Sequence, residues 1–76
     1  MDAVKIGQIV RAHRKASGLS REDFARLAGV GKTVVYDIEH GKASIQTDTL
    51  LKVLHGLNIS IRLESPLMKH LGYAES

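Results

Sequence analysis

Four glycines divide the central part of the chain into two short segments, and this division limits the fold more than any other feature. Gly18 and Gly41 stand at the outer ends, and Gly29 and Gly31 stand in the middle, so each segment has ten residues or fewer. Glycine often follows the last turn of a helix, and helices this short persist only when they pack against the rest of a domain. We therefore expect two short helices that are joined by a tight turn.

The first segment has the signals of a helix start and of a buried face. Ser20 opens it with a capping box, and Leu19 can pack against Phe24 as a hydrophobic staple. Leu27 and Ala28 continue the face that we expect to be buried. The segment is therefore predicted to form a helix of barely two turns.

The second segment is predicted to form a helix over about residues 32–40, with Val35 and Ile38 facing the core. Ala25, on the preceding helix, has the small side chain that a close helix crossing needs. Two short helices joined by a glycine-containing turn form a helix-turn-helix. The central part of the chain is therefore predicted to be such a unit.

An amphipathic pattern before this unit predicts another helix. Ile6, Ile9, Val10 and His13 recur at the spacing i, i+3, i+4, i+7, which is typical of one face of an α-helix. We expect this helix over about residues 3–16.

A fourth helix is predicted after the unit, with Thr47 as its N-cap. Its apolar side chains lie on more than one side and are Leu50, Leu51, Val53, Leu54 and Leu57. One side would cover the first three helices, and the other side needs a different partner.

Residues 58–64 alternate polar and apolar side chains, which predicts a half-buried strand with Ile59, Ile61 and Leu63 on one face. The chain has no second strand-like run, and a lone strand leaves its backbone groups unpaired. A second copy could pair with it in an antiparallel, two-fold symmetric ribbon. A strand edge on another protein, or a tail that stays disordered when free, is the alternative.

The expected fold is therefore all-α, with four to five helices that include the helix-turn-helix. One C-terminal β-strand is added, forming an antiparallel ribbon between subunits. We place this domain at residues 1–64, and we expect a short tail at residues 65–76 that holds at most one helical turn.

Composition excludes several classes of site. The chain has no cysteine, and none of His13, His40, His55 and His70 has a histidine partner at helical zinc-ligand spacing. We therefore expect no metal, no cofactor and no enzyme activity. No apolar run is long enough to span a membrane, and no secretory signal is recognisable, so we expect a cytoplasmic, nucleoid-associated protein without membrane contact.

The positive charge is unevenly distributed along the chain. The net charge is +3, from 11 basic and 8 acidic residues. Residues 1–46 hold eight basic and five acidic residues, whereas the two signs balance in residues 47–76. The first part of the chain therefore has the electrostatic character of a surface that binds a polyanion.

Four stretches closely resemble the Cro/XRE family of phage-repressor-type helix-turn-helix proteins. They are GLSREDFA at 18–25, LAGV at 27–30, IEHGK at 38–42 and DTLLKVL at 48–54, and Arg14 adds to the match. The resemblance implies a repressor-like helix-turn-helix domain and a DNA-binding regulator of transcription.

Residues 43–54, followed by the predicted strand, resemble the HipB-type antitoxins within that family. This narrower resemblance implies a homodimer whose C-terminal strands pair across the two-fold axis. It also implies repression of the protein's own operon and binding of a HipA-type kinase toxin. The alternative is a stand-alone phage or chromosomal repressor that has no toxin partner.

The second helix of such a motif places its N-terminal end in the major groove. In this chain that end carries Lys32 and Thr33, with Tyr36 and Asp37 one turn later. Lysine can donate to guanine, and a threonine methyl group can touch the thymine methyl. Asp37 would repel phosphate, so it either accepts from a cytosine amino group or stays away from the DNA. The expected DNA is a duplex with a palindromic operator.

Three cations are expected to contact DNA phosphates. They are Arg21 at the start of the first motif helix, Lys42 in the loop after the second, and Arg11 on the preceding helix. By the resemblance, Arg14 pairs with Glu39 and ties the first helix to the reading helix. We expect this pair to be structural, so that its loss weakens DNA binding only through misfolding.

Overall fold

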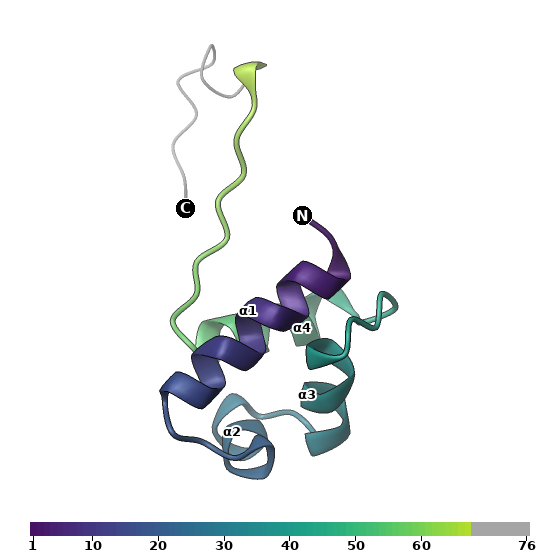
Figure 1. Cartoon of the computed structure of the whole chain (residues 1–76). Helices are drawn as coiled ribbons and strands as arrows, with labels where there is room; N and C mark the ends of the chain where they lie inside the picture. The colour runs from purple at the N-terminus through teal and green to yellow at the C-terminus, as the bar shows by residue number, and fades with distance from the viewer. Residues whose placement is uncertain (68–76) are drawn as a thin grey trace.

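In the computed structural model, which describes residues 1–67, these residues form four helices connected by turns and one longer loop (Figure 1). The helices are α1 (Ala3–Ala16), α2 (Arg21–Ala28), α3 (Lys32–Glu39) and α4 (Thr47–Gly56). The all-helical domain predicted from the sequence is confirmed. Residues 68–76 of the predicted tail lie outside the described residues.

Short polar caps and glycines set the helix ends. The Ser20 side chain accepts a hydrogen bond from the Asp23 backbone N–H at 3.0 Å, as the capping box predicted. Asp2 caps α1 in the same way, through a 2.8 Å bond from the backbone N–H of Lys5. Gly29 follows α2 with φ of 76°, a left-handed conformation that glycine adopts at little cost.

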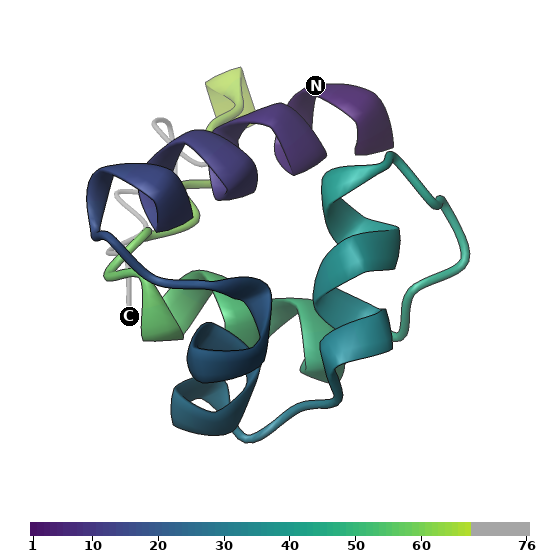
Figure 2. The same ribbon diagram turned by 60° about the horizontal axis from the view of Figure 1, so that its bottom comes forward.

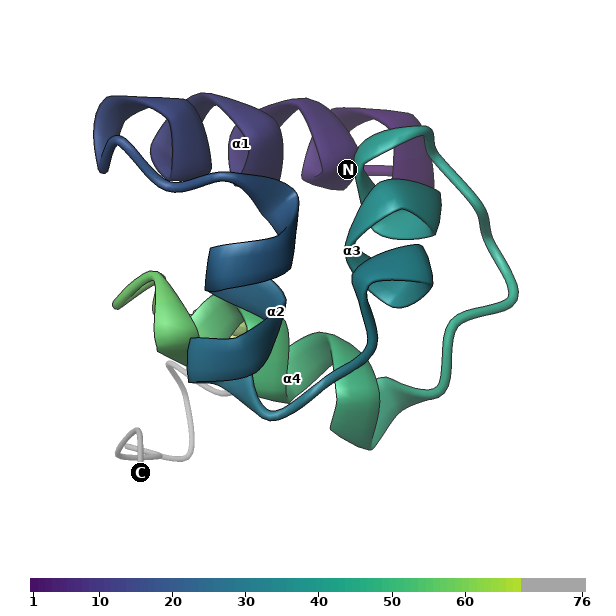
Figure 3. The same cartoon turned by 90° about the horizontal axis from the view of Figure 1, so that it is seen from below.

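The helices pack in pairs around one small core. α1 lies against α3 and α2 lies against α4, and α2 and α3 lie side by side between the other two (Figures 2 and 3). Every helix contributes to the buried apolar core, which consists of Val10, Phe24, Ala25, Val35, Ile38, Val53 and Leu54. The core therefore fixes both motif helices, although each has only eight residues.

A glycine that the sequence analysis did not single out permits the contact between α1 and α3. A Cβ atom built on Gly7 would lie 2.2 Å from the carbonyl oxygen of Ile38 and 3.0 Å from that of Glu39. The two backbones therefore approach more closely than any other residue at this position allows.

Several side chains lie elsewhere than the sequence predicted. Leu27 is 73% exposed rather than buried. The buried side of α2 runs through Phe24, Ala25 and Ala28, and at 100° per residue Leu27 falls to one side of that stripe. His13 is also exposed rather than part of the buried face of α1.

The fourth helix differs from its prediction at two points. Gln46 occupies the N-cap position, and Thr47 is the first helical residue. Leu51 is almost half exposed, whereas Val53 and Leu54 are buried. Only one side of α4 is therefore covered by the other helices.

No strand is formed within residues 1–67 of the single chain. The segment after α4 runs without helix or strand from residue 59 to residue 65 and projects away from the helices (Figure 1). Ile59 packs against the core, whereas Ile61 is 51% and Leu63 is 70% exposed. A strand needs a hydrogen-bonding neighbour, so the ribbon between subunits stays a prediction.

The described residues contain no helix long and apolar enough to cross a membrane.

Candidate nucleic-acid interface

The turn at residues 29–31 presents one side of α3 to solvent. Gly31 occupies the N-cap position of α3 in an extended conformation. Lys32, Thr33 and Tyr36 are exposed on the helix that follows, and Asp37 is half-buried beside them. The four residues predicted to read bases therefore lie within the first two turns of α3, at or near its surface.

A cleft of about 760 Å³ lies where the N-terminal ends of α2 and α3 meet. It is lined by Arg14, Ser20, Arg21, Glu22, Lys32, Thr33 and Tyr36. The cleft brings the predicted phosphate contact of α2 together with three of the predicted base-reading residues of α3. Lys42 and Arg11 do not line it, and both are exposed elsewhere on the surface.

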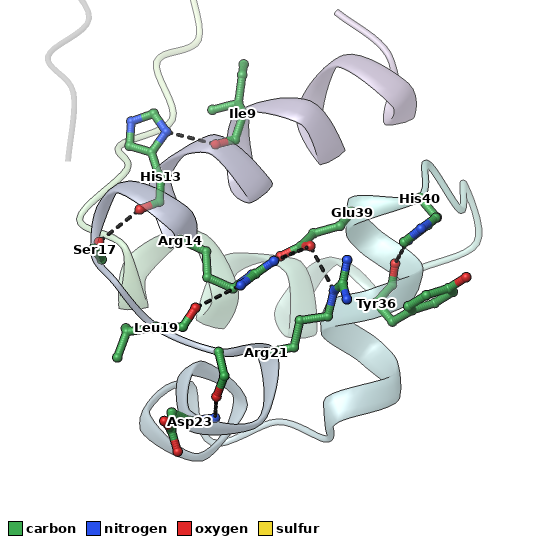
Figure 4. Close-up of polar contacts among 11 residues, drawn as sticks. Ile9, His13, Arg14, Ser17, Leu19, Arg21, Asp23, Tyr36, Glu39 and His40 are labelled. Atoms are coloured by element: carbon green, nitrogen blue, oxygen red, sulfur yellow. Dashed lines mark hydrogen bonds and ion pairs between the residues drawn. The ribbon is translucent and has the colours of Figure 1, made fainter.

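A buried carboxylate behind the cleft holds two arginines from two other elements (Figure 4). Arg14 Nε donates to Glu39 Oε2 at 2.6 Å, and Arg14 Nη2 donates to Glu39 Oε1 at 3.1 Å. Arg21 Nε donates to the same Oε1 at 2.9 Å. Arg14 also donates to the carbonyl oxygen of Leu19 at 2.7 Å. The pair implied by the resemblance is therefore formed, and Arg21 joins it.

The ionisation of Glu39 follows from these contacts. Burial alone would raise the pKa of its carboxyl, but the hydrogen bonds from Arg14 and Arg21 outweigh burial and leave that pKa below its ordinary value of 4.5. The hydrogen bond to Glu39 in turn raises the pKa of Arg14. At neutral pH the group therefore consists of two cations and one anion, with a net charge of +1.

Tyr36 is held by an aromatic and a cationic neighbour. Its ring stacks on that of His40, with centroids 3.8 Å apart and an angle of 18° between the planes. Arg21 Cζ lies 5.3 Å from the centroid of the Tyr36 ring, within the range of a cation–π interaction. These contacts limit the directions in which the half-exposed Tyr36 side chain can point.

Each of the two candidate lysines has an acidic neighbour in the free protein. Lys32 Nζ lies 3.9 Å from Glu22 Oε2, and Lys42 Nζ lies 3.5 Å from Asp37 Oδ2. Such exposed ion pairs contribute about 0–1 kcal/mol, so a DNA phosphate or base can replace them at little cost. Of the two positions left open for Asp37, the free protein shows the carboxylate turned toward Lys42.

Sequence reasoning missed the contact of Arg21 with Glu39 and the stacking of His40 on Tyr36. The second was detectable, because residues four apart lie on the same face of a helix. The first joins side chains eighteen positions apart on two helices and depends on how those helices pack.

The fold and this cleft define a helix-turn-helix protein, and comparison with known proteins agrees. The family model described as helix-turn-helix matches residues 10–63. The chain therefore belongs to the Cro/XRE-type helix-turn-helix family, and it is a transcriptional regulator of that type.

Particular relatives come from bacteria and from a phage. The chain is 39% identical over 61 residues to an uncharacterized HTH-type transcriptional regulator, y4mF, of Sinorhizobium fredii, with 80% of each protein covered. It is 27% identical over 63 residues to the ImmF control region 10 kDa protein of Bacillus phage phi105, covering 83% of this chain and 70% of that protein.

A solved structure also matches closely. The restriction-modification controller protein C.AhdI from Aeromonas hydrophila superposes with a TM-score of 0.68 at 37% sequence identity. The match covers 78% of this chain and 86% of the controller protein.

Proposed function

We propose that the chain binds double-stranded DNA as a homodimer and represses transcription at a palindromic operator. The observation that carries this proposal is the exposed start of α3, where Lys32, Thr33 and Tyr36 share one cleft with Arg21 of α2. In helix-turn-helix proteins this end of the second motif helix enters the major groove. Relatives named as a transcriptional regulator and as a controller protein support the same role.

The exposed residues of α3 would read the bases. Lys32 would leave Glu22 and donate to guanine O6 and N7, and the Thr33 methyl group would contact a thymine methyl. Tyr36, whose orientation is restricted by His40 and Arg21, would contact a base edge or a phosphate. Asp37 would either accept from cytosine or stay with Lys42.

The cations around the cleft would hold the DNA backbone. Arg21 would contact a phosphate from the edge of the cleft, and Lys42 and Arg11 would contact phosphates on either side of the groove. These contacts are independent of sequence, so they would provide affinity rather than specificity.

The homodimer is supported by the segment that projects from the helices. Ile61 and Leu63 are apolar and exposed in the single chain, where residues 59–65 do not form a strand. Pairing with the same segment of a second copy would give an antiparallel ribbon that fixes the two α3 helices relative to each other. Half-sites about one helical turn apart would follow.

Selection from a pool of random duplexes, followed by binding titrations on the selected duplex and on a random one, tests the proposal. Affinity should fall on the order of a thousandfold between about 50 and about 200 mM salt. Lys32→Ala should cost roughly 1–3 kcal/mol on the selected duplex and much less on random DNA. Lys42→Ala should weaken both alike.

Lys52→Ala is the matched control, because Lys52 is exposed on α4 and away from the cleft. It should bind both duplexes like the unmodified protein. The proposed function fails if the protein selects no common sequence, or if its affinity hardly changes with salt. An equal loss on both duplexes for Lys32→Ala would show that Lys32 contacts phosphate and that the bases are read elsewhere.

An antitoxin is a second candidate within the same proposal. The resemblance of residues 43–54 to HipB-type antitoxins favours it, and so does the exposed apolar segment beyond α4. The partner would be a HipA-type kinase toxin, and the protein would repress its own operon. Co-purification with the product of the neighbouring gene tests this: a stable complex supports the antitoxin, and a repressor that purifies alone favours the stand-alone alternative.

The stand-alone alternative has its own support, since the relatives include a phage control-region protein and a restriction-modification controller. In both versions the chain would act by binding alone, without catalysis. It would work where the DNA is, in the cytoplasm at the nucleoid.

A further inference from the structure

The Arg21 side chain connects the protein interior with the proposed DNA surface. Its Nε donates to the carboxylate of Glu39 (Figure 4), which is inaccessible to solvent. The Arg21 side chain itself is 30% exposed and lines the cleft. The centroid of the Tyr36 ring lies 5.3 Å from Arg21 Cζ, so the ring restricts the orientation of the guanidinium from another side. Arg21 is therefore held at one end and open at the other.

The two Nη groups are the part of the guanidinium that takes no part in the hydrogen bond to Glu39. Within the described residues, the hydrogen bond of Nε to Glu39 is the only one that Arg21 makes through its side chain. An arginine offers five N–H donors in a fixed planar fork. Bonding through Nε therefore leaves the Nη donors available without requiring the guanidinium to turn.

The charges of Arg14, Arg21 and Glu39 indicate which kind of ligand the Nη donors of Arg21 would bind. Arg14 already neutralises Glu39 through two hydrogen bonds, so the charge of Arg21 is in excess. The excess positive charge therefore lies on Arg21, which is partly exposed, and not on Arg14, which is buried. The chemical group that complements a planar cation with free Nη donors is an oxyanion such as a DNA phosphate.

We propose that Glu39 is a positioning residue for DNA binding, which aims the Nη groups of Arg21 at a backbone phosphate while it keeps the Nε. This rests on the DNA-binding function proposed above, and it gives Glu39 a second role beyond the structural one expected from its pairing with Arg14. The ordering of the arginine is completed during folding, so less side-chain entropy is lost on binding.

Arg21→Lys separates this arrangement from a simple effect of charge. Lysine keeps the positive charge, but its single ammonium cannot donate to Glu39 and to a phosphate in the fixed geometry of a guanidinium. We expect Arg21→Lys to lower affinity about tenfold on selected and random duplexes alike, close to the loss for Arg21→Ala. Arg26→Lys, at an exposed arginine on the same helix, is the matched control and should bind like the unmodified protein.

The outcomes distinguish this proposal from the function on which it rests. If the unmodified protein binds no duplex, the proposed function fails. If it binds DNA and Arg21→Lys binds equally well, only charge matters at this position and the positioning role is overturned.

A double-mutant cycle tests Glu39 itself. Glu39→Gln should weaken DNA binding, and Arg21→Lys should then cost much less than it does in the unmodified protein, because the two residues act as one unit. Independent, additive losses would overturn the proposal.

A spectroscopic measurement covers the case in which Glu39→Gln does not fold. The arginine Nε–H resonances of the unmodified protein can be followed by NMR, with that of Arg21 assigned by its loss in Arg21→Lys. Its Nε–H should stay protected from solvent exchange when the duplex binds. Loss of that protection would mean that Arg21 leaves Glu39 to reach the DNA, which contradicts the proposal.

Discussion

Replacing Gly7 by alanine should destabilise the domain, although alanine is the better helix former. In an ordinary helix interior the exchange would stabilise by about 1 kcal/mol. Here the added Cβ would lie 2.2 Å from the backbone carbonyl oxygen of Ile38, where ordinary van der Waals contact begins at 3.4 Å. α1 would therefore have to move away from α3 by about 1 Å.

The loss of stability in Gly7→Ala depends on the atoms that the new methyl group would meet. Overpacking costs about 1–3 kcal/mol, and the upper end applies because the obstacle is a helix backbone and not the end of a flexible side chain. Subtracting the gain in helix propensity leaves a net loss of about 2 kcal/mol. For a domain of this size the melting temperature should fall by about 10 °C.

Thermal unfolding followed by circular dichroism, at equal protein concentrations, measures this loss. Gly31→Ala is the matched control, since Gly31 has an ordinary negative φ and a Cβ there would meet nothing within 4 Å. It should cost less than about 1 kcal/mol. A Gly7→Ala protein that melts at or above the temperature of the unmodified protein would refute the close contact between α1 and α3.

Two further predictions concern pH and association. The pKa of Glu39 is lowered by folding, so its ionised form stabilises the fold above pH 4.5, and this contribution is lost as the pH falls through the lower folded pKa. The melting temperature should therefore decline below about pH 4.5. The melting temperature of Glu39→Gln, whose side chain cannot titrate, should decline less steeply. Parallel curves of melting temperature against pH for the two proteins would exclude this role of Glu39. Ile61→Asp should dissociate the proposed dimer and lower operator affinity while the helices stay folded, and light scattering after size exclusion gives the mass. A mutant that stays dimeric, or an unmodified protein that is monomeric at tens of micromolar, would be incompatible with the self-paired ribbon.

The helices were predictable because their signals are local. The expected helix over residues 3–16 matches α1, and the cap at Ser20 and the stop at Gly29 bound α2 as predicted. Side-chain periodicity and capping act within a turn or two of the chain. They can be read without knowing how the helices pack.

Features that depend on packing could not be predicted in this way. The need for glycine at position 7 arises from the carbonyl of Ile38, which is distant in sequence. Leu27 has the right spacing for a buried residue, but α2 packs through a neighbouring stripe that leaves it exposed. The candidate site was likewise predicted only in part. The exposed residues of α3 were identified from the motif, whereas the contact of Arg21 with Glu39 was not.

The shortness of α2 and α3 has a consequence for the lifetime of the protein. Each has eight residues and is held by tertiary contacts, so the surface that meets DNA exists only in the folded chain. A duplex that binds only this form adds about 2.7 kcal/mol of apparent stability at a hundred times its Kd. Proteases attack mainly unfolded chains. Molecules on their DNA sites would then outlast free ones, and the number of occupied sites would help to set how much of the protein the cell retains.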